Sequence, residues 1–163
     1  MPTKNDPNSQ DSRCSCTALR KASRRISLLY DAALAPSGLK TTQRAILAEI
    51  RRCEPTTVGG LAEALVMDAG ALAHTLKPLE RDRLVSIDVD PQDRRNRVLR
   101  LTAAGRTRLA ESDVFWESAQ RGFEAAFGRV KSEALREAMS FLVSGEFVRA
   151  FQKATPTSKA QPS

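Results

Sequence analysis

Over residues 57–105 the spacing of apolar residues is first helical and then alternating, which predicts two helices followed by two strands. Residues 58–65 have the pattern of a short apolar helix, and a tight turn follows at residues 66–67. The next helix runs over residues 68–80, with Asp68 as a suitable N-cap. Its buried face is predicted to consist of Leu72, Leu76 and Leu79.

The pattern then becomes the alternation typical of a β-strand, over residues 84–90. The apolar face of this strand comprises Val85, Ile87 and Val89. After a turn over residues 91–96, a second strand over residues 97–101 completes a hairpin. Two short helices followed by a basic β-hairpin predict a winged helix-turn-helix over about residues 40–105. That architecture is typical of proteins that put a helix in a DNA groove and the hairpin on the backbone beside it.

Further helices precede this motif. A long helix is predicted over about residues 13–35, ended by residues 36–38. Its apolar stripe comprises Leu19, Ala22, Ile26, Leu29 and Ala33. A second helix starts at Thr41 or Thr42 and stops before Pro55. Its inward residues are Ile46, Leu47 and Ile50.

Two more helices follow the hairpin. Thr102 is a suitable N-cap for a long helix that reaches about Phe127, where Gly128 breaks it. A last helix is predicted over about residues 130–152. Their apolar positions include Leu109, Trp116, Ala119, Phe123, Ala126, Leu135, Met139, Leu142, Phe147, Val148 and Phe151. Because the terminal helices carry more apolar surface than a compact winged helix needs, we expect a homodimer, whose two reading heads suit a pseudo-palindromic DNA site.

The predicted fold is therefore mainly α with a small β-hairpin wing. It combines the winged helix-turn-helix with an all-helical dimerisation region made of about residues 13–35 and 102–152. These parts form a single domain over residues 13–153. Residues 1–12 and 154–163 are predicted to be disordered tails, because they have little apolar surface to bury.

The composition of the chain indicates what kind of partner it binds and in which cellular compartment it is found. The chain has 26 Lys and Arg against 19 Asp and Glu, a net charge of +7, which favours a polyanionic partner. Many arginines lie on or next to the predicted hairpin: Arg81, Arg83, Arg94, Arg95, Arg97, Arg100, Arg106 and Arg108. There is neither an apolar run suited to a membrane span nor a signal-like start, and the odd number of cysteines is typical of a reducing cytosol. We expect a cytoplasmic protein with no membrane partner.

Several short motifs resemble the MarR family of bacterial transcription regulators, over roughly residues 14–152. They are Leu-Lys-Thr-Thr-Gln at 39–43, Asp-Ala-Gly-Ala-Leu at 68–72, Leu-Lys-Pro-Leu-Glu at 76–80, Asp-Arg-Arg at 93–95 and Leu-Thr-Ala-Ala-Gly at 101–105. The resemblance implies an obligate dimer with an all-helical dimerisation region and two winged lobes. Members of the family are mostly repressors that are released by a small ligand or by cysteine oxidation.

In that family the second helix of the motif enters the major groove. Here its outward positions are Ala69, Gly70, Ala73, His74 and Lys77. The family often has Arg and Ser or Thr near the start of this helix. Small residues permit close approach and can contact a thymine methyl, but they cannot form bidentate bonds to guanine. His74, the only histidine, is either a groove contact or a solvated surface residue, and the helix phase favours the groove.

The hairpin wing carries positive charge, which compensates for the small outward side chains of this helix. The resemblance implies that Arg95 is the wing-tip arginine that enters the minor groove and that Asp93 orients it. Arg94 stands where the family commonly has glycine. Arg94 and Arg97 are predicted to contact phosphates, which is a salt-sensitive role without sequence preference. The alternative is a solvated charged loop, which so dense a cluster of arginines disfavours.

A cysteine sensor is one predicted switch. Cys14 and Cys16 lie at the start of the first helix, where the helix N-terminus and nearby arginines favour a reactive thiolate. Cys16 aligns with the sensing cysteine of the family's organic-hydroperoxide repressors, and Tyr30 aligns with a tyrosine that contacts it there. Two other tyrosines of that arrangement are replaced by Arg20 and Thr41. Within one helix, residues two apart point to different faces, which disfavours a bond between the two thiols.

A small-molecule ligand is the other predicted switch, and the one that we favour. The resemblance implies an effector pocket lined by the first, second and fifth helices. Tyr30 and arginines such as Arg20 are suited to an aromatic carboxylate there.

Metal and enzyme chemistry find little support. The three cysteines and His74 lack the spacing of a zinc site, and we expect Cys53 to be a small packed residue. No cofactor, catalytic carboxylate pair, phosphate loop or nucleophile motif is recognisable. The favoured function is a sequence-specific regulator of transcription that binds double-stranded DNA. The alternatives are a redox-sensing repressor that acts through Cys16 and a winged-helix protein-interaction module that does not read DNA.

Overall fold

Helix α2 (Ser15–Leu34) opens the part of the chain that the computed structural model describes, which comprises residues 14–90, 93–94 and 96–155. It matches the first predicted helix. The 3₁₀ helix η1 (Ala35–Ser37) follows, and Gly38 ends it with a φ of 74°, a left-handed conformation that glycine adopts without strain. Most of the predicted apolar stripe of α2 is solvent-exposed in the single chain, and the one buried residue of the helix, Leu34, was not part of that stripe.

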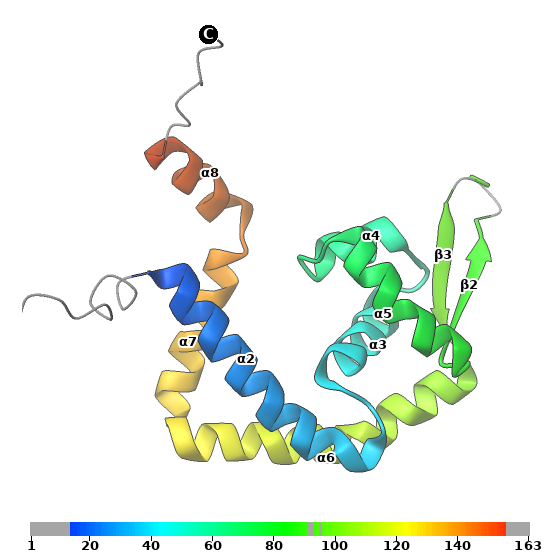
Figure 1. The fold of residues 1–163 in the computed structure, drawn as a ribbon, viewed down its shortest axis with the longest axis horizontal. Coiled ribbons are helices and arrows are strands. Elements are labelled where there is room, and N and C mark those ends of the chain that lie inside the picture. Colours follow the sequence, from blue (N-terminus) through cyan, green and yellow to red (C-terminus); the bar gives the residue numbers. More distant parts are fainter. Residues whose placement is uncertain (1–13, 91–92, 95, 156–163) are drawn as a thin grey trace, which may run out of the picture. The chain divides into compact units, whose positions relative to one another are not determined.

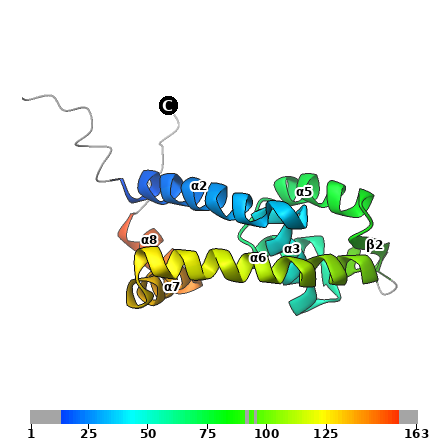
Figure 2. The same ribbon diagram turned by 90° about the horizontal axis from the view of Figure 1, so that it is seen from below.

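The core lies in the next helices. In chain order these are α3 (Thr41–Cys53), β1 (Thr56–Thr57), α4 (Val58–Ala64) and α5 (Ala69–Arg81). The predicted inward residues are buried: Ile46, Leu47 and Ile50 of α3, Leu61 of α4, and Leu72, Leu76 and Leu79 of α5. α3 lies between α5 and the first half of α6 (Ala103–Phe127), so it is the central helix of this core (Figure 2). The positions and buried faces of α3, α4 and α5 therefore confirm the helical part of the predicted motif.

The hairpin of β2 (Val85–Val89) and β3 (Arg97–Leu101) belongs to a three-stranded antiparallel sheet in the order β1-β3-β2. Strand β1 was not predicted. It pairs Thr56 with Leu99, opposite Ile87 on the other side of β3. Val85 is buried and Ile87 is half-buried, but Val89 is exposed. The hairpin is therefore buried where β2 begins and exposed where β2 ends, and Figure 1 shows it extending away from the helices.

Helix α6 is tied to the hairpin at its first turn. The hydroxyl of Thr102 accepts a hydrogen bond from the Gly105 N–H (2.9 Å) and donates one to the Arg83 carbonyl (2.6 Å), which confirms the predicted cap. A Cβ atom on Gly105 would lie 1.9 Å from the Leu84 carbonyl oxygen. Only glycine permits this approach of α6 to the sheet, which accounts for the glycine that ends the Leu-Thr-Ala-Ala-Gly motif.

The chain divides into two compact units within α6, between Ala119 and Gln120. The second unit contains the end of α6, α7 (Arg129–Leu142) and α8 (Gly145–Ala154). The sequence predicted one helix over residues 130–152, and this was wrong. Ser144 interrupts it, because its hydroxyl accepts a hydrogen bond from the Phe147 N–H (3.2 Å) and starts a new helix. The exposed apolar residues of this unit include Phe127, Val130, Phe141, Val143, Val148 and Phe151.

Candidate nucleic-acid interface

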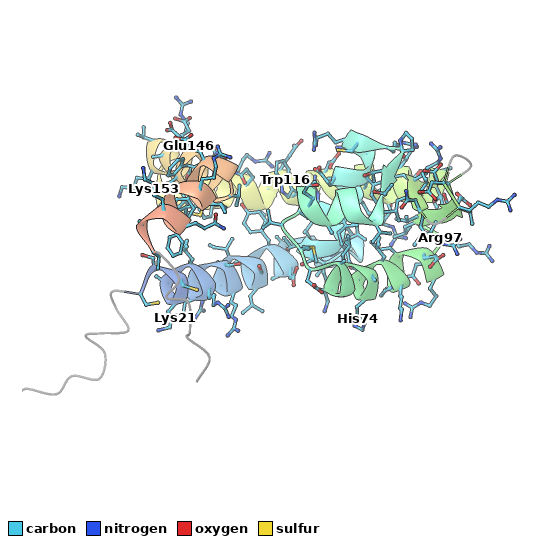
Figure 3. The ribbon with its side chains drawn as sticks, turned by 90° about the horizontal axis from the view of Figure 1, so that it is seen from above. Lys21, His74, Arg97, Trp116, Glu146 and Lys153 are labelled. Atoms are coloured by element: carbon cyan, nitrogen blue, oxygen red, sulfur yellow. The ribbon has the colours of Figure 1, made fainter. Side chains whose placement is uncertain are left out.

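The outward face of α5 is available to a partner. Every residue predicted to face DNA is exposed: Ala69, Gly70, Ala73, His74 and Lys77. Asp68 caps the helix, accepting hydrogen bonds from the N–H groups of Gly70 (2.9 Å) and Ala71 (3.1 Å). The three buried leucines on the opposite side hold α5 against the core. His74 projects away from the helix (Figure 3), and among the described residues no carboxylate pairs with it or with Lys77.

The wing tip is partly described. Asn96 donates through its amide Nδ2 to Asp93 Oδ2 (3.3 Å), and the Asn96 N–H donates to the Asp93 carbonyl (2.9 Å). These bonds join Asp93 to Asn96 just before β3. Arg94 and Arg97 are exposed beside it. Arg95, the predicted minor-groove residue, lies outside the described residues.

The structure separates the arginines near the hairpin into two groups. Carboxylates neutralise three of them: Asp82 pairs with Arg81, Glu54 with Arg106 and Glu111 with Arg108. Among the described residues no ion pair reaches the exposed Arg83, Arg94, Arg97 or Arg100. The sequence pattern alone treated these side chains as one cluster. The uncompensated charge belongs to the hairpin and the turn before it.

Glu54 connects three elements of the winged lobe. Its carboxylate accepts a hydrogen bond from the Leu101 N–H (3.0 Å) and pairs with Arg106, so the segment after α3 is tied to β3 and α6. Burial raises the pKa of this carboxyl, but the Leu101 N–H and the Arg106 guanidinium outweigh burial and hold the pKa below its ordinary value. Sequence reasoning missed Glu54, because nothing near it in the chain indicates its partners.

The predicted sensor residues lie on α2. Cys16 and Arg20 are exposed and Tyr30 is half-buried. Cys14 precedes the helix with extended backbone, and Cys14 and Cys16 are both exposed and form no disulfide within the described residues. Cys53 is half-buried, and its thiol donates a hydrogen bond to Glu49 (3.4 Å). Burial, and then this hydrogen bond, raise the pKa of Cys53, which disfavours the reactive thiolate.

An open pocket of about 440 Å³ lies where η1 meets α6. It is lined by Ala35, Pro36, Ser37, Gly38, Arg108, Glu111 and Phe115. Arg108 spans it, donating to the Ser37 carbonyl (3.3 Å). The structure therefore does not bring Cys16, Arg20 or Tyr30 into this pocket.

A second polar cluster, between α3 and α6, was not predicted. Arg44 donates to Asp113 (2.6 Å), Arg51 lies 3.8 Å from the same carboxylate, and the Arg44 guanidinium stacks on Trp116 at 4.5 Å from the ring centroid. Figure 3 labels Trp116 on α6. Because Arg44 and Asp113 are 69 residues apart in the chain, no local pattern indicates their contact.

Within the described ranges, no three His, Cys, Asp or Glu side chains gather as a metal site would require. None of the helices that the structure describes combines the length and apolar character needed to span a membrane.

The sequence profile of the MarR family matches residues 39–96. The DNA complex of the Mycobacterium tuberculosis transcriptional regulator MosR is similar to this chain. It shares 31% sequence identity, covers 78% of this chain and 96% of its own, and has a TM-score of 0.68. No curated protein sequence matches the chain significantly.

Two further structures show the same fold. The transcriptional repressor CouR, bound to a 23-mer DNA duplex, has 22% identity and a TM-score of 0.76, with 87% of this chain and 100% of CouR covered. PcaV from Streptomyces coelicolor, in complex with its natural ligand, has 18% identity and a TM-score of 0.74, with 90% of this chain and 99% of PcaV covered.

Proposed function

The chain belongs to the MarR family of DNA-binding transcriptional regulators, which are not enzymes, and on that premise we propose that it is a dimeric repressor released by a small ligand. It would bind a pseudo-palindromic operator and act in the cytoplasm. The observation that carries the proposal is the exposed outer face of α5 beside a hairpin whose exposed arginines form no ion pair among the described residues.

The proposed DNA contacts come from two surfaces, the outer face of α5 and the hairpin wing. Ala69, Gly70, Ala73, His74 and Lys77 would lie in the major groove. The small side chains let the backbone approach the bases, and His74 supplies a hydrogen-bonding group. Arg94 and Arg97 would bind phosphates, while Arg95, oriented by Asp93, would enter the minor groove.

The test of this proposal is binding to duplex DNA at increasing salt. Affinity should fall steeply, because each neutralised phosphate releases counterions, yet one sequence should remain preferred over bulk competitor DNA. Sequencing the promoter fragments that the protein retains would give the operator. A protein-interaction module without DNA reading would show weak binding of equal strength to all sequences.

Exposed apolar side chains support the dimer. They lie on α2 (Leu19, Leu28, Leu29) and in the second unit (Val130, Phe141, Val143, Val148, Phe151). Apolar surface on this scale is uncommon on a soluble monomer and is typical of an interface. MosR and CouR were solved with DNA, and a dimer would place two copies of α5 on such a duplex.

A ligand switch is supported by the open pocket at η1 and α6. PcaV, a protein of this fold, was solved in complex with its natural ligand. We propose a small ligand for this chain also, with an aromatic carboxylate as the favoured class. Arg20 and Tyr30 of α2 are the contacts that the sequence suggests, although neither of them lines this pocket.

A thiol switch is the second candidate, because Cys14 and Cys16 are both exposed. An organic hydroperoxide would oxidise Cys16 and release DNA, and a thiol reductant would restore binding. The discriminating test is a gel shift of wild type and Cys16→Ser with the oxidant. If wild type alone releases DNA, the thiol is the switch. If both proteins keep their DNA, the ligand proposal stands.

A further inference from the structure

One side of α2 carries positive charge with no acidic residue beside it. Residues 14–30 contain no Asp or Glu, whereas Lys21, Arg24 and Arg25 follow one another closely. All three side chains are exposed, and among the described residues none of them forms an ion pair. The next acid along the helix is Asp31, whose carboxylate accepts a backbone N–H from α3 (2.7 Å). We call these three cationic residues the basic face of α2.

The spacing of these residues places them on one side of the helix. Lys21 is three residues before Arg24 and four before Arg25, and side chains at those spacings are neighbours on an α-helix. The predicted apolar stripe, which passes through Ile26 and Leu29, lies on a different side. Like charges four residues apart destabilise a helix, so the basic face does not contribute to the stability of α2. A binding role accounts for this concentration of charge.

The basic face of α2 and the outer face of α5 lie on the same side of the first unit. Both helices belong to that unit, and the hydrogen bond from the Thr41 N–H to Asp31 ties α2 to α3, the central helix of the core. Figure 3 shows Lys21 and His74 projecting in the same direction. In Figures 2 and 3, α5 lies between α2 and the hairpin. The outer face of α5 therefore has a basic surface on each side, the hairpin on one and α2 on the other.

We propose that the basic face of α2 binds phosphates of the DNA duplex that α5 reads, an inference that rests on the proposed function of this chain. The phosphates of a duplex form regular rows of negative charge, which adjacent cations on one helix face complement. Because α5 lies between the two basic surfaces, the phosphates bound by α2 and by the hairpin lie on opposite sides of the bases that α5 reads. The contact adds affinity at every sequence alike, since phosphates carry no sequence information.

Removal of two charges tests this contact in solution. The variant Lys21→Gln/Arg25→Gln keeps residue types that favour a helix. On the operator, the slope of log K against log salt should decrease by about 0.9 for each phosphate that is no longer neutralised, and affinity at about 0.15 M salt should fall roughly tenfold. The melting temperature should stay the same or rise, because neighbouring like charges are removed. Arg20 is left in place, because it is also the suggested effector contact.

The matched control removes two charges from the second unit. Lys131→Gln/Lys153→Gln changes exposed residues of α7 and α8 and should keep the wild-type salt slope. Arg24→Glu is an independent variant of the basic face, and its reversed charge should weaken operator binding at least as much as the double variant does. Circular dichroism and sedimentation check that each variant is folded and dimeric, and either α2 variant alone suffices for the comparison with the control.

Ethylation of single phosphates locates the contact on the operator, because an ethylated phosphate loses its charge and weakens binding wherever the protein contacts it. With the wild-type protein, interference should appear on both sides of the bases that α5 reads. Lys21→Gln/Arg25→Gln should lose the interference on one side, and Arg97→Ala should lose it on the other.

An unchanged salt slope and an unchanged interference pattern in the folded α2 variants would overturn the inference and leave an acidic protein as the partner of this face. An equal decrease in slope for Lys131→Gln/Lys153→Gln would also overturn it, because net charge alone would then explain the effect. Sequence preference of the wild-type protein is measured first. If it is absent, the proposed function fails, whereas a preferred operator that wild type and the α2 variants bind equally overturns only the contact of α2.

Discussion

Val66 holds the turn between α4 and α5 in a conformation that branched side chains disfavour. Its φ is 51°, and 71% of the side chain is exposed, so little burial compensates for the strain. Asparagine adopts this left-handed conformation more readily. We predict that Val66→Asn raises the free energy of unfolding by about 1 kcal/mol. Urea denaturation measures this, and a decrease in stability would show that the Val66 side chain makes contacts that favour the native fold.

Two wing arginines should differ in how their replacement affects binding. Arg97→Ala should reduce the slope of log K against log salt by about 0.9 for each phosphate that is no longer neutralised, at every sequence alike. Arg95→Ala should cost roughly 1–3 kcal/mol, mostly at operators with an A·T-rich minor groove at the wing. Anisotropy titrations at several salt concentrations distinguish them, with the exposed Lys131→Ala of α7 as the control. Identical effects of both substitutions on all sequences would contradict the minor-groove role of Arg95.

Among elements, the junction of α6 with the sheet depends on one glycine. Gly105→Ala places a Cβ against the Leu84 carbonyl, so the helix has to move away from β2. We predict that stability falls by at least about 2 kcal/mol. Gly122→Ala is a matched control on the same helix, because a Cβ there meets nothing within 4 Å, and it should stabilise the helix by roughly 0.5–1 kcal/mol. Equal stability of the two variants, measured by thermal unfolding, would mean that the approach at Gly105 is not needed.

Glu54 should make the winged lobe sensitive to acid. Its folded pKa lies below the ordinary value of 4.5, so its stabilising contribution is present above that pH and disappears as the pH falls through the folded pKa. Glu54→Gln should therefore lower stability at neutral pH by about 1 kcal/mol, since the ion pair with Arg106 can no longer form. The difference between variant and wild type should shrink below about pH 4.5. Denaturation midpoints across this range are the measurement, and a difference independent of pH would contradict this role.

Local signals account for the elements that the sequence predicted. The Asp68 and Thr102 caps and the leucine spacing of α5 all lie within a few residues of the structure that they produce. Strand β1 has two residues and exists through its pairing with β3, so its own sequence carries no strand pattern. The break at Ser144 was missed because one capping serine competes with apolar residues that favour a continuous helix on either side.

The candidate site likewise combines features that the local sequence determines with features that arise only when the fold brings distant residues together. The outward face of α5 was predictable, because burial of its leucines determines which residues point away. Which arginines are neutralised depends instead on carboxylates brought near by the fold, such as Glu54 beside Arg106. The pairing of Arg44 with Asp113 joins positions 69 residues apart, and only the packing of α3 against α6 reveals it.

At the scale of the whole molecule, the proposed operator binding depends on two copies of the chain. Phe151 of α8 is 57% exposed and continues a row of rings with Phe147 and Phe141, which is a surface suited to a partner. Phe151→Glu places a charge there and should shift sedimentation from dimer to monomer, while Gln152→Glu adds the same charge at the next position and should leave the dimer intact. A monomer has one reading head, so its affinity for the full operator should fall by a factor of roughly 10²–10⁴, with half-site binding retained. A Phe151→Glu protein that sediments as a dimer and binds the operator fully would exclude this row of rings from the interface.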